Sequence, residues 1–366
     1  MPKSLKIAVI PGDGIGPEIT REAVRVLDVV QKKLGTFELD LQYQDTSVDR
    51  YRRTGVAMSD EAFADCKAAD AIFLGAIGIP EVRLPDGTEV QPEIVLRLRF
   101  SLGLYSGIRP VKYYEGVQSR IMDPRIDYVV MRESTEGLYA SRNGGNVVHD
   151  EIATDTMVIS RMGTARIVRA AAKLARQRAA AKGRRGKVTC VDKANILRSY
   201  AFFRKVYDEV MDEFPDLDRD YAYVDAMMIN MVLWPERYDV IVVENMFGDI
   251  ISDLGPATVG GMGMAPSADA GDRWGMFQPS HGSAPTIAGQ NIANPIATIL
   301  SGAMMLNWLD ERHPGLELKR AADLIDASVA EFVRKKEGLT TDIGGNGTTS
   351  GVGDGVIAVI EKAKLG

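Results

Sequence analysis

The sequence predicts an α/β fold in which βα units surround a mostly parallel sheet. Two observations support this prediction. Short runs of β-branched residues alternate with long amphipathic stretches, and a glycine-rich turn joins the first run to the first stretch. The chain has 366 residues, which exceeds one average domain, so we expect two core-forming units or one large unit with an insertion.

The expected strands and helices follow from β-branched runs and from apolar residues at helical spacing. Strands are expected at residues 6–10, 71–74, 128–132, 187–192 and 240–243. Helices are expected at residues 17–34, 164–181 and 200–213, and from about Pro295 onward. The segment 138–155 contains an Asn-Gly-Gly turn between extended residues, which predicts a protruding hairpin or arm.

Composition and charge exclude several classes of partner. The net charge is −6 and the basic residues are dispersed, so nucleic acid is not an expected ligand. The most apolar stretch, residues 71–80, is too short for a membrane span. The start of the chain lacks the pattern of a signal peptide, and Cys66 and Cys190 stand far apart as reduced thiols would, so we expect a cytoplasmic protein.

The turn PGDGIGPE, residues 11–18, places Gly12, Gly14 and Gly16 between a strand and a helix. Its backbone amides could approach a phosphate, or the turn could simply be tight enough to need glycine. The G-x-G-x-G spacing differs from the dinucleotide-binding fingerprint, and no acidic residue follows at the required distance. The turn alone therefore does not predict a Rossmann domain.

Three aspartates are candidates for a metal site. Asp249 and Asp253, in ENMFGDIISD, stand four residues apart and so share one face of a helix, where two like charges repel. A hard cation such as Mg²⁺ or Mn²⁺ would offset that repulsion, whereas a solvated helix face is the alternative. Asp225, in YAYVDAMMIN, is a lone acid in an apolar segment, where burial would require a partner.

Four basic residues are candidates for substrate binding and catalysis. Arg99, Arg109 and Arg132 lie in otherwise apolar stretches, so we expect partly buried guanidiniums that could hold a dicarboxylate. Lys193 directly follows an expected strand, at the edge where open α/β sheets bind ligands, and it could act as a base. Each of the four could instead be an ordinary surface or salt-bridge residue.

A loop rich in Gly, Ser, Asn and Pro precedes the helix expected near Pro295. It consists of HGSAP, residues 281–285, followed by GQNIANP, residues 289–295. Such a loop can wrap a nucleotide with backbone amides and amide side chains. His281 is the one histidine of the chain in such a setting.

These motifs stand in one order along the chain: GDGIGPE, LRxxLxLYxxIRP, RExTEGLY, VDKANIL, YVDAM, NMFGDIISD, HGSAP and IANP. Together they resemble the β-decarboxylating dehydrogenases, the isocitrate and isopropylmalate dehydrogenase family, with 3-isopropylmalate dehydrogenase closest in pattern. The resemblance implies two α/β domains with the active site in the cleft between them. A larger, discontinuous cofactor-binding domain would comprise residues 1–105 and 265–366. A smaller domain, residues 106–264, would carry the dimer interface and the arm.

The resemblance also implies a role for individual residues. Substrate carboxylates would be bound by Arg99, Arg109 and Arg132, with Val95 and Leu96 facing the group on C3. The metal ligands would be Asp249 and Asp253 of one subunit and Asp225 of the partner subunit. Asp225 would also contact the substrate, and the partner subunit would supply Lys193 as well. A homodimer would then be required for activity. The residues implied to contact the cofactor are Asn195, His281, Gly282, Ser283, Ala284, Pro285, Ile287, Asn294 and Asp342.

The implied reaction is an oxidative decarboxylation of a hydroxy-dicarboxylate. Lys193 would take the proton of the C2 hydroxyl, directly or through water, while hydride leaves C2 for the nicotinamide. Loss of CO₂ from the resulting β-keto acid leaves an enolate, which Tyr139 would protonate at C3. A divalent cation, Mg²⁺ or Mn²⁺, would stabilise the negative charge that develops on the substrate oxygens.

Two departures from the family pattern concern the cofactor. NAD-using members commonly carry an acid directly after HGSAP, where this chain has Thr286. NADP-using members carry basic residues near the C-terminal segment, where this chain has Asp342, which would repel a 2′-phosphate. We therefore expect NAD rather than NADP. Gln278 stands where relatives usually have a glutamate near the nicotinamide.

Substrate choice depends on the residues that precede Arg99. Isocitrate enzymes carry Ser and Asn at the positions of Glu93 and Val95, so isocitrate and homoisocitrate are disfavoured here. Val95 and Leu96 suit an alkyl group such as isopropyl, although Pro92 stands where the isopropylmalate pattern has its glutamate. D-malate and tartrate remain alternatives. A non-catalytic regulatory subunit is the rival from another class.

Overall fold

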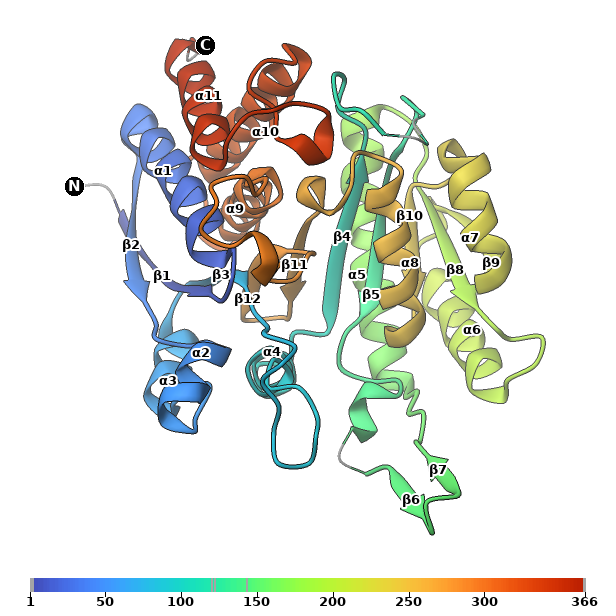
Figure 1. The fold of residues 1–366 in the computed structure, drawn as a ribbon. Coiled ribbons are helices and arrows are strands. Elements are labelled where there is room, and N and C mark those ends of the chain that lie inside the picture. Colours follow the sequence, from blue (N-terminus) through green and yellow to red (C-terminus); the bar gives the residue numbers. More distant parts are fainter. Residues whose placement is uncertain (1–2, 120, 122, 143, 365–366) are drawn as a thin grey trace. The chain divides into compact units, whose positions relative to one another are not determined.

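The computed structural model describes residues 3–119, 121, 123–142 and 144–364. The chain forms two compact units (Figure 1). Unit 1 comprises residues 1–103, 114–122 and 259–366, and unit 2 comprises residues 104–113 and 123–258. The chain leaves unit 1 and later returns to it, so unit 1 is discontinuous in sequence.

Within its described residues, unit 1 contains five strands in the order β2-β1-β3-β12-β11. Their bounds are β1 Lys3–Gly12, β2 Phe37–Tyr43, β3 Ala71–Ala76, β11 Pro266–Ala270 and β12 Gly275–Pro279. All neighbours run parallel except β11 and β12, which are antiparallel. Every residue of β3 is buried, as expected for a central strand that is covered on both faces.

The described residues of unit 1 form the α-helices α1 Gly16–Leu34, α2 Val48–Thr54, α3 Asp60–Ala68, α4 Pro92–Ser101, α9 Ile296–Asp310, α10 Leu318–Arg334 and α11 Thr349–Lys362. Helices α1, α9, α10 and α11 gather on one face of the sheet, and α2, α3 and α4 lie on the other (Figure 1). Helix α9 is buried along most of its length, because it packs on β11 and β12 and is covered by α1 and α10. Helix α1 ends at Leu34 and is capped by Gly35, whose φ of 69° is the left-handed conformation common just after helix ends.

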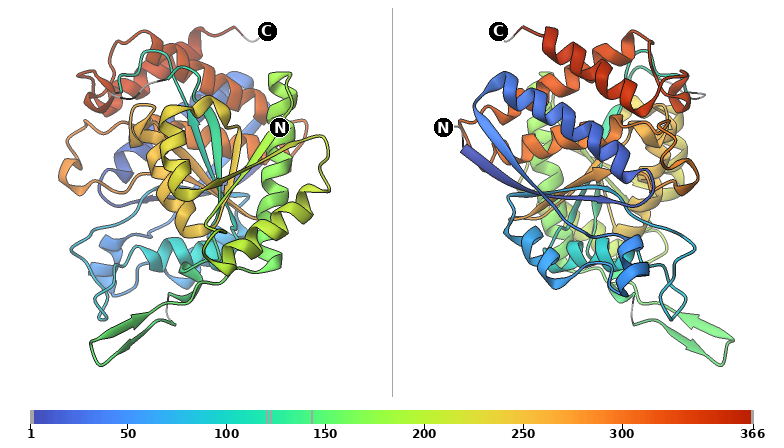
Figure 2. Two further views of the ribbon diagram at one scale, coloured as in Figure 1. Left: turned by 90° about the vertical axis from the view of Figure 1, so that its right-hand side faces the viewer. Right: turned by 60° about the vertical axis from the view of Figure 1, so that its left-hand side comes forward.

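Apart from the two short strands of the arm, the described part of unit 2 contributes five strands to the sheet, in the order β4-β5-β10-β8-β9. Their bounds are β4 Ser106–Lys112, β5 Asp127–Glu133, β8 Lys187–Asp192, β9 Asp218–Tyr223 and β10 Val240–Val243, and only the β4–β5 pair is antiparallel. Its helices are α5 Arg161–Lys182, α6 Arg198–Met211, α7 Val224–Leu233 and α8 Asn245–Ala257. Helices α5 and α6 cover one face of this sheet, and α7 and α8 lie on the other (Figure 2).

Short 3-10 helices complete the described elements: η1 Tyr139–Ser141, η2 Pro235–Arg237, η3 Met262–Met264, η4 Pro285–Ile287 and η5 Thr341–Ile343. The predicted α/β fold with a mostly parallel sheet is confirmed. Each predicted strand and helix overlaps an observed one, and residues 187–192 and 240–243 match β8 and β10 in full. No helix within the described part of the chain is long and apolar enough to cross a membrane.

The predicted arm is a two-stranded antiparallel hairpin, β6 Asn146–Val148 and β7 Ile152–Thr154, which extends from unit 2 (Figure 1). The turn assignment was wrong. The strands are joined by the three residues 149–151, in which His149 and Asp150 have φ values of 55° and 58° and the N–H of Glu151 donates to the carbonyl of Val148 at 3.0 Å. Gly144 and Gly145 precede β6, and Asn143 of the Asn-Gly-Gly motif lies outside the described residues.

The parallel strands bring the candidate residues to two edges. In unit 2, β5, β10 and β8 run side by side, so Arg132 near the end of β5, Asn245 after β10 and Lys193 after β8 share the carboxyl edge of the sheet. In unit 1, β1, β3 and β12 are parallel, and the glycine turn after β1 lies at the same edge as the segment 280–285 after β12.

A buried acid forms ion pairs with helix α5 at the amino edge of the unit 2 sheet, opposite the carboxyl edge. Asp239, which is 3% exposed, accepts a hydrogen bond of 2.8 Å from Nε of Arg178, and Lys182 lies 3.4 Å from the same carboxylate. Arg178 also bonds the carboxylate of Asp127 at 2.9 Å. The pKa of Asp127 is lowered: burial opposes the ionised form, but the charge of Arg178 and the hydrogen bonds of Lys182 and Arg178 outweigh it.

We predict that Arg178→Ala lowers the free energy of unfolding by about 3 kcal/mol, because it leaves Asp239 buried with less compensating charge. The control is Arg169→Ala on the same helix, whose ion pair with Glu213 is about half exposed and should contribute at most about 1 kcal/mol. Urea denaturation measures both variants. Equal shifts in the two would show that the buried network is not stabilising.

Candidate active site

At the carboxyl edge of unit 2, a buried arginine organises three neighbours. Arg132 is 3% exposed and forms a close ion pair with Oδ1 of Asp249, while its Nε donates to Oδ1 of Asn245 at 2.9 Å. The hydroxyl of Tyr139 donates to Oδ2 of Asp249 at 2.8 Å, and its ring lies 5.4 Å from the Arg132 guanidinium carbon. Tyr139 and Asp249 are thus in direct contact, 110 residues apart in sequence.

The start of helix α8 positions the two carboxylates predicted to bind metal. The side chain of Glu244 caps this helix by accepting from the backbone N–H of Met246 at 2.7 Å. Asp249 and Asp253 then follow one helical turn apart. The pKa of Asp253 is raised by burial and by the charge of Asp249, while Arg109 and Arg132 act in the opposite direction. Two repelling carboxylates are a donor pair that fits a hard divalent cation.

Asp225 lies elsewhere in unit 2 and pairs with the predicted base. It is at the start of α7, where its Oδ1 accepts from Nζ of Lys193 at 2.7 Å, and this hydrogen bond lowers the pKa of Asp225. The inference that the apolar segment would bury this acid was wrong, because the side chain of Asp225 is 69% exposed. Helix α7 turns Met227 and Met231 inward and leaves Ile229 and Leu233 exposed, so an apolar sequence does not bury its polar neighbour.

The three predicted metal ligands are therefore not brought together within one chain. Among the described residues, no group of three or more His, Cys, Asp or Glu side chains could hold a metal ion. Asp249 and Asp253 share helix α8, whereas Asp225 is held by Lys193. The chain thus presents two separate clusters, one with two carboxylates and one with a lysine and a carboxylate; we refer to them below as the two half-sites of the function that we propose.

Arg99, one of the three arginines predicted to bind substrate, lies in unit 1. Arg99, on α4, is 7% exposed, and its Nη2 bonds Oδ2 of Asp269 on β11 at 3.0 Å. Gln278, on β12, donates from Nε2 to the same oxygen at 2.8 Å. Val95 lies one helical turn before Arg99 and is 5% exposed, whereas Leu96 is half-buried. The expectation that Arg99, Arg109 and Arg132 are buried is confirmed.

The glycine turn of unit 1 packs directly against the segment that contains HGSAP. The N–H of Ile15 donates to the carbonyl of Ser283 at 2.8 Å, and the N–H of Asp13 donates to the carbonyl of Ala76 at 2.7 Å. A Cβ on Gly14 would lie 2.1 Å from the Ser283 carbonyl oxygen, and the φ of Gly14 is +57°. These amides therefore serve the protein's own contacts, and Gly14 is required for the close approach of the two loops.

The remaining predicted cofactor residues also lie around this loop, except one. Asn294 donates to Oδ2 of Asp342 at 3.0 Å, and Thr340 donates to Oδ1 of that carboxylate at 2.5 Å. His281 contacts the Gly282 carbonyl through Nδ1 at 2.9 Å, and burial lowers the pKa of this imidazole. Ile287 packs on a small core cluster of Ile15, Ile19 and Ala293, whereas Ala284, Pro285 and Thr286 are exposed. The exception, Asn195, is exposed in the turn after β8 of unit 2.

Sequence reasoning missed three residues that hold the site side chains. Asn245 bonds Arg132 and also donates to the Glu136 carbonyl at 2.7 Å, which joins β5 to α8. Asp269 is fully buried beside Arg99. Asp13 accepts from the N–H groups of residues 48, 49 and 78 at 3.0 to 3.1 Å. A signal existed for Asp269, since an acid inside the apolar strand PSADA requires a buried partner.

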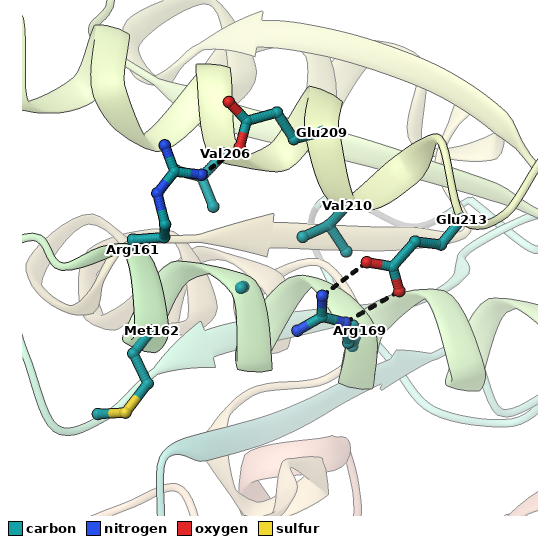
Figure 3. Close-up of a pocket in the computed structure, with 8 residues that line it drawn as sticks. Arg161, Met162, Arg169, Val206, Glu209, Val210 and Glu213 are labelled. Carbon is teal, nitrogen blue, oxygen red and sulfur yellow. Dashed lines mark hydrogen bonds and ion pairs between the residues drawn. The ribbon is translucent and has the colours of Figure 1, made fainter.

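A separate groove of about 480 Å³ lies between α5 and α6 (Figure 3). The ion pairs Arg161–Glu209 and Arg169–Glu213 span it, and Val206 and Val210 are among its lining residues. None of the predicted site residues lines this groove. It is therefore not the candidate active site.

Comparison with known proteins identifies the family. The family model of isocitrate/isopropylmalate dehydrogenase matches residues 6–356. The chain is 45% identical to a 3-isopropylmalate dehydrogenase of Thermotoga maritima over 82% of this chain and 84% of that protein. It is 40% identical to a 3-isopropylmalate/3-methylmalate dehydrogenase of Methanocaldococcus jannaschii over 93% and 94% of the two chains. The chain belongs to the isocitrate/isopropylmalate dehydrogenase family.

The fold agrees with this assignment. A crystal structure of an isocitrate dehydrogenase from Methylococcus capsulatus superposes with a TM-score of 0.84 at 32% identity, covering 98% of this chain and 100% of that one. The predicted isopropylmalate/isocitrate dehydrogenase-like fold is thereby confirmed. The protein is an enzyme, a dehydrogenase of this family, and the predicted family resemblance holds over nearly the whole chain.

We predict that Gly14→Ala destabilises the protein by about 1 to 3 kcal/mol more than Gly35→Ala, because only Gly14 has no room for a Cβ. Both glycines have positive φ, so the control carries the backbone strain alone. Thermal denaturation of the two variants gives the difference. If the two lost equal stability, the close approach of Gly14 to Ser283 would not be the reason for glycine.

Proposed function

We propose that this chain catalyses the NAD-dependent oxidative decarboxylation of a 3-alkylmalate, most specifically 3-isopropylmalate. The observation that carries the proposal is the 40–45% identity to enzymes named for that substrate, over 82–93% of the chain. Every residue proposed for the chemistry is present, which opposes a non-catalytic regulatory subunit. Val95 and Leu96 supply an apolar environment that favours an alkyl group over the third carboxylate of isocitrate.

The proposed substrate-binding groups are the buried guanidiniums of Arg99, Arg109 and Arg132. Burial strengthens their attraction for the carboxylates of a malate and limits the water that competes for them. Asn245 and Asp269 hold two of them by hydrogen bonds, so little side-chain entropy is lost on binding. This preorganisation would place C2 of the substrate in one orientation.

Asp249, Asp253 and the partner subunit's Asp225 are the proposed ligands of a divalent cation. When bound, Mg²⁺ or Mn²⁺ would supply positive charge that favours loss of the hydroxyl proton and stabilises the enolate. The carboxylate pair on α8 fits this group chemically: burial and the charge of Asp249 raise the pKa of Asp253, and a bound cation would offset the repulsion between the two carboxylates. Metal affinity should therefore depend on both carboxylates.

Two protonatable groups of this chain are proposed to move protons. The amine of Lys193 takes the proton of the C2 hydroxyl, directly or through one water, while hydride passes from C2 to NAD. After CO₂ leaves, the phenol of Tyr139 donates a proton to C3. The contact of this phenol with Asp249 supports a position beside the substrate's charged oxygens.

We propose that two copies of the chain share each active site, with Lys193 and Asp225 facing Asp249 and Asp253 of the other copy. The separation of the two half-sites within one chain supports this arrangement. Unit 2 also exposes large apolar side chains that a second copy would cover: Val147 and Ile152 in the arm, Ile196 after β8, Ile229 and Leu233 on α7, and Ile250 on α8. Such exposure is costly in an isolated chain.

NAD is the proposed cofactor, because the carboxylate of Asp342 would oppose the 2′-phosphate of NADP. Asn294 and Thr340 hold that carboxylate in place. Thr286 provides no acid after HGSAP, so Asp342 carries the discrimination. We further propose a cytoplasmic location, which the two free, buried cysteines, Cys66 and Cys190, support.

The proposed activity is tested by following reduction of NAD and of NADP with Mn²⁺ present. The candidate acids are 3-isopropylmalate, D-malate, tartrate and isocitrate. We expect the highest kcat/KM with 3-isopropylmalate and NAD. Preference for D-malate or tartrate would overturn the alkyl-group assignment, and no reduction with any acid would overturn the catalytic role.

The shared active site is tested by mixing two inactive variants. Lys193→Ala and Asp253→Asn should each lose turnover, while Lys193→Ala still binds NAD. In a mixed dimer one site would carry both changes and the other neither, so co-refolding in equal amounts should restore roughly a quarter of wild-type activity. Recovery of no activity would place all these residues in one chain's own site. Lys205→Ala, an exposed lysine on α6, is the control and should keep full turnover.

A further inference from the structure

The side chain of Gln278 takes part in the buried network that holds Arg99. One oxygen, Oδ2 of Asp269, accepts two hydrogen bonds, 3.0 Å from Nη2 of Arg99 and 2.8 Å from Nε2 of Gln278. Asp269 is fully buried, and Arg99 and Gln278 are each 7% exposed. The three residues come from α4, β11 and β12, all within unit 1.

Gln278 is itself fixed by its backbone. Its carbonyl oxygen accepts hydrogen bonds from Oγ of Ser267 at 2.9 Å and from Oγ of Ser301 at 2.8 Å. Ser267 lies opposite Gln278 in the β11–β12 pair, and Ser301 lies on α9. The amide of Gln278 therefore reaches Asp269 from a rigid position, and Asp269 in turn restrains the guanidinium of Arg99.

The network leaves Arg99 able to bind a further acceptor. Its Nε is buried and has no hydrogen-bond partner among the described residues. A buried N–H without a partner is costly, and an external carboxylate would remove that cost. Because Gln278 is uncharged, it adds no negative charge beside Asp269. A glutamate at 278 would add a second negative charge beside Asp269 and weaken the attraction of Arg99 for an anion.

We propose that Gln278 is a positioning residue for substrate binding: it orients Asp269, and through it Arg99, without adding a negative charge beside Asp269, so that Arg99 can bind a substrate carboxylate. This inference rests on the proposed function, in which Arg99 binds the hydroxy acid. Gln278 acts on the affinity for the acid, whereas the proton-transfer groups Lys193 and Tyr139 lie in unit 2.

The test compares Gln278→Glu and Gln278→Met with the matched control Gln42→Glu. Gln42 also donates its amide to a carboxylate, Asp40 at 3.0 Å, but at the exposed surface of β2. With the acid that the wild-type enzyme oxidises best, we expect Gln278→Glu to raise the KM for the acid about tenfold and Gln278→Met less. The kcat and the KM for NAD should stay within about threefold, and Gln42→Glu should match the wild type.

A double-mutant cycle shows whether Gln278 acts through Arg99. In an Arg99→Lys background, Gln278→Met should have little further effect on the KM for the acid, because the guanidinium that it orients is gone. An unchanged KM in Gln278→Glu and Gln278→Met, an equal rise in the KM for NAD, or full additivity with Arg99→Lys would each overturn the proposal. If Gln278→Glu does not fold, Gln278→Met and the cycle decide it.

The two proposals fail in different ways. A wild-type enzyme that prefers D-malate overturns the assigned substrate, yet the same comparison of KM values with D-malate still tests Gln278. A wild-type enzyme that oxidises 3-isopropylmalate, with Gln278 variants of unchanged KM, retains the proposed function and overturns the positioning role.

Discussion

The parallel alignment of β5, β10 and β8 is the constraint on which the candidate site depends. Parallel strands end at one edge of the sheet, so Arg132, Lys193 and Asn245 all lie at that edge. In the sequence they are separated by whole helices. The covering helices then decide orientation. Helix α8 directs Asp249 toward Arg132 and Tyr139, and α7 directs Asp225 toward Lys193.

Charge pairing keeps this site stable before any ligand binds. Arg132 and Arg99 are almost completely buried, and each lies against a carboxylate, of Asp249 and Asp269 respectively. An unpaired guanidinium at such depth would cost several kcal/mol. The pairs differ in accessibility, since Asp249 is 43% exposed and Asp269 is not exposed at all. In the proposed function Asp249 would exchange partners when a cation binds, whereas the buried Asp269 would keep holding Arg99.

The division of the acidic residues is the observation behind our proposal that two copies of the chain share each active site. The carboxylate of Asp249 repels the carboxylate of Asp253, whereas the amine of Lys193 forms an ion pair with Asp225. Both half-sites lie in unit 2, which also exposes apolar side chains in its arm and on α7 and α8. A second copy that covered those side chains would serve stability and catalysis together, because the same contact would bury apolar surface and complete the set of carboxylates.

Five strands, four helices and the arm could be predicted from the sequence, because helix and strand periodicities depend on residues close in the chain; the sequence also indicated that three arginines would be buried and that Asp249 and Asp253 share a helix face. Only the tertiary structure decided which groups pair. Asp269 meets Arg99 across 170 residues, and Gly14 meets Ser283 through a loop contact that no local pattern encodes. The same reason explains why the hairpin turn lies at His149 and not at the Asn-Gly-Gly motif, and why Asp225 is exposed. Strand pairing decides the position of the turn and helix packing decides the exposure of Asp225, rather than local composition.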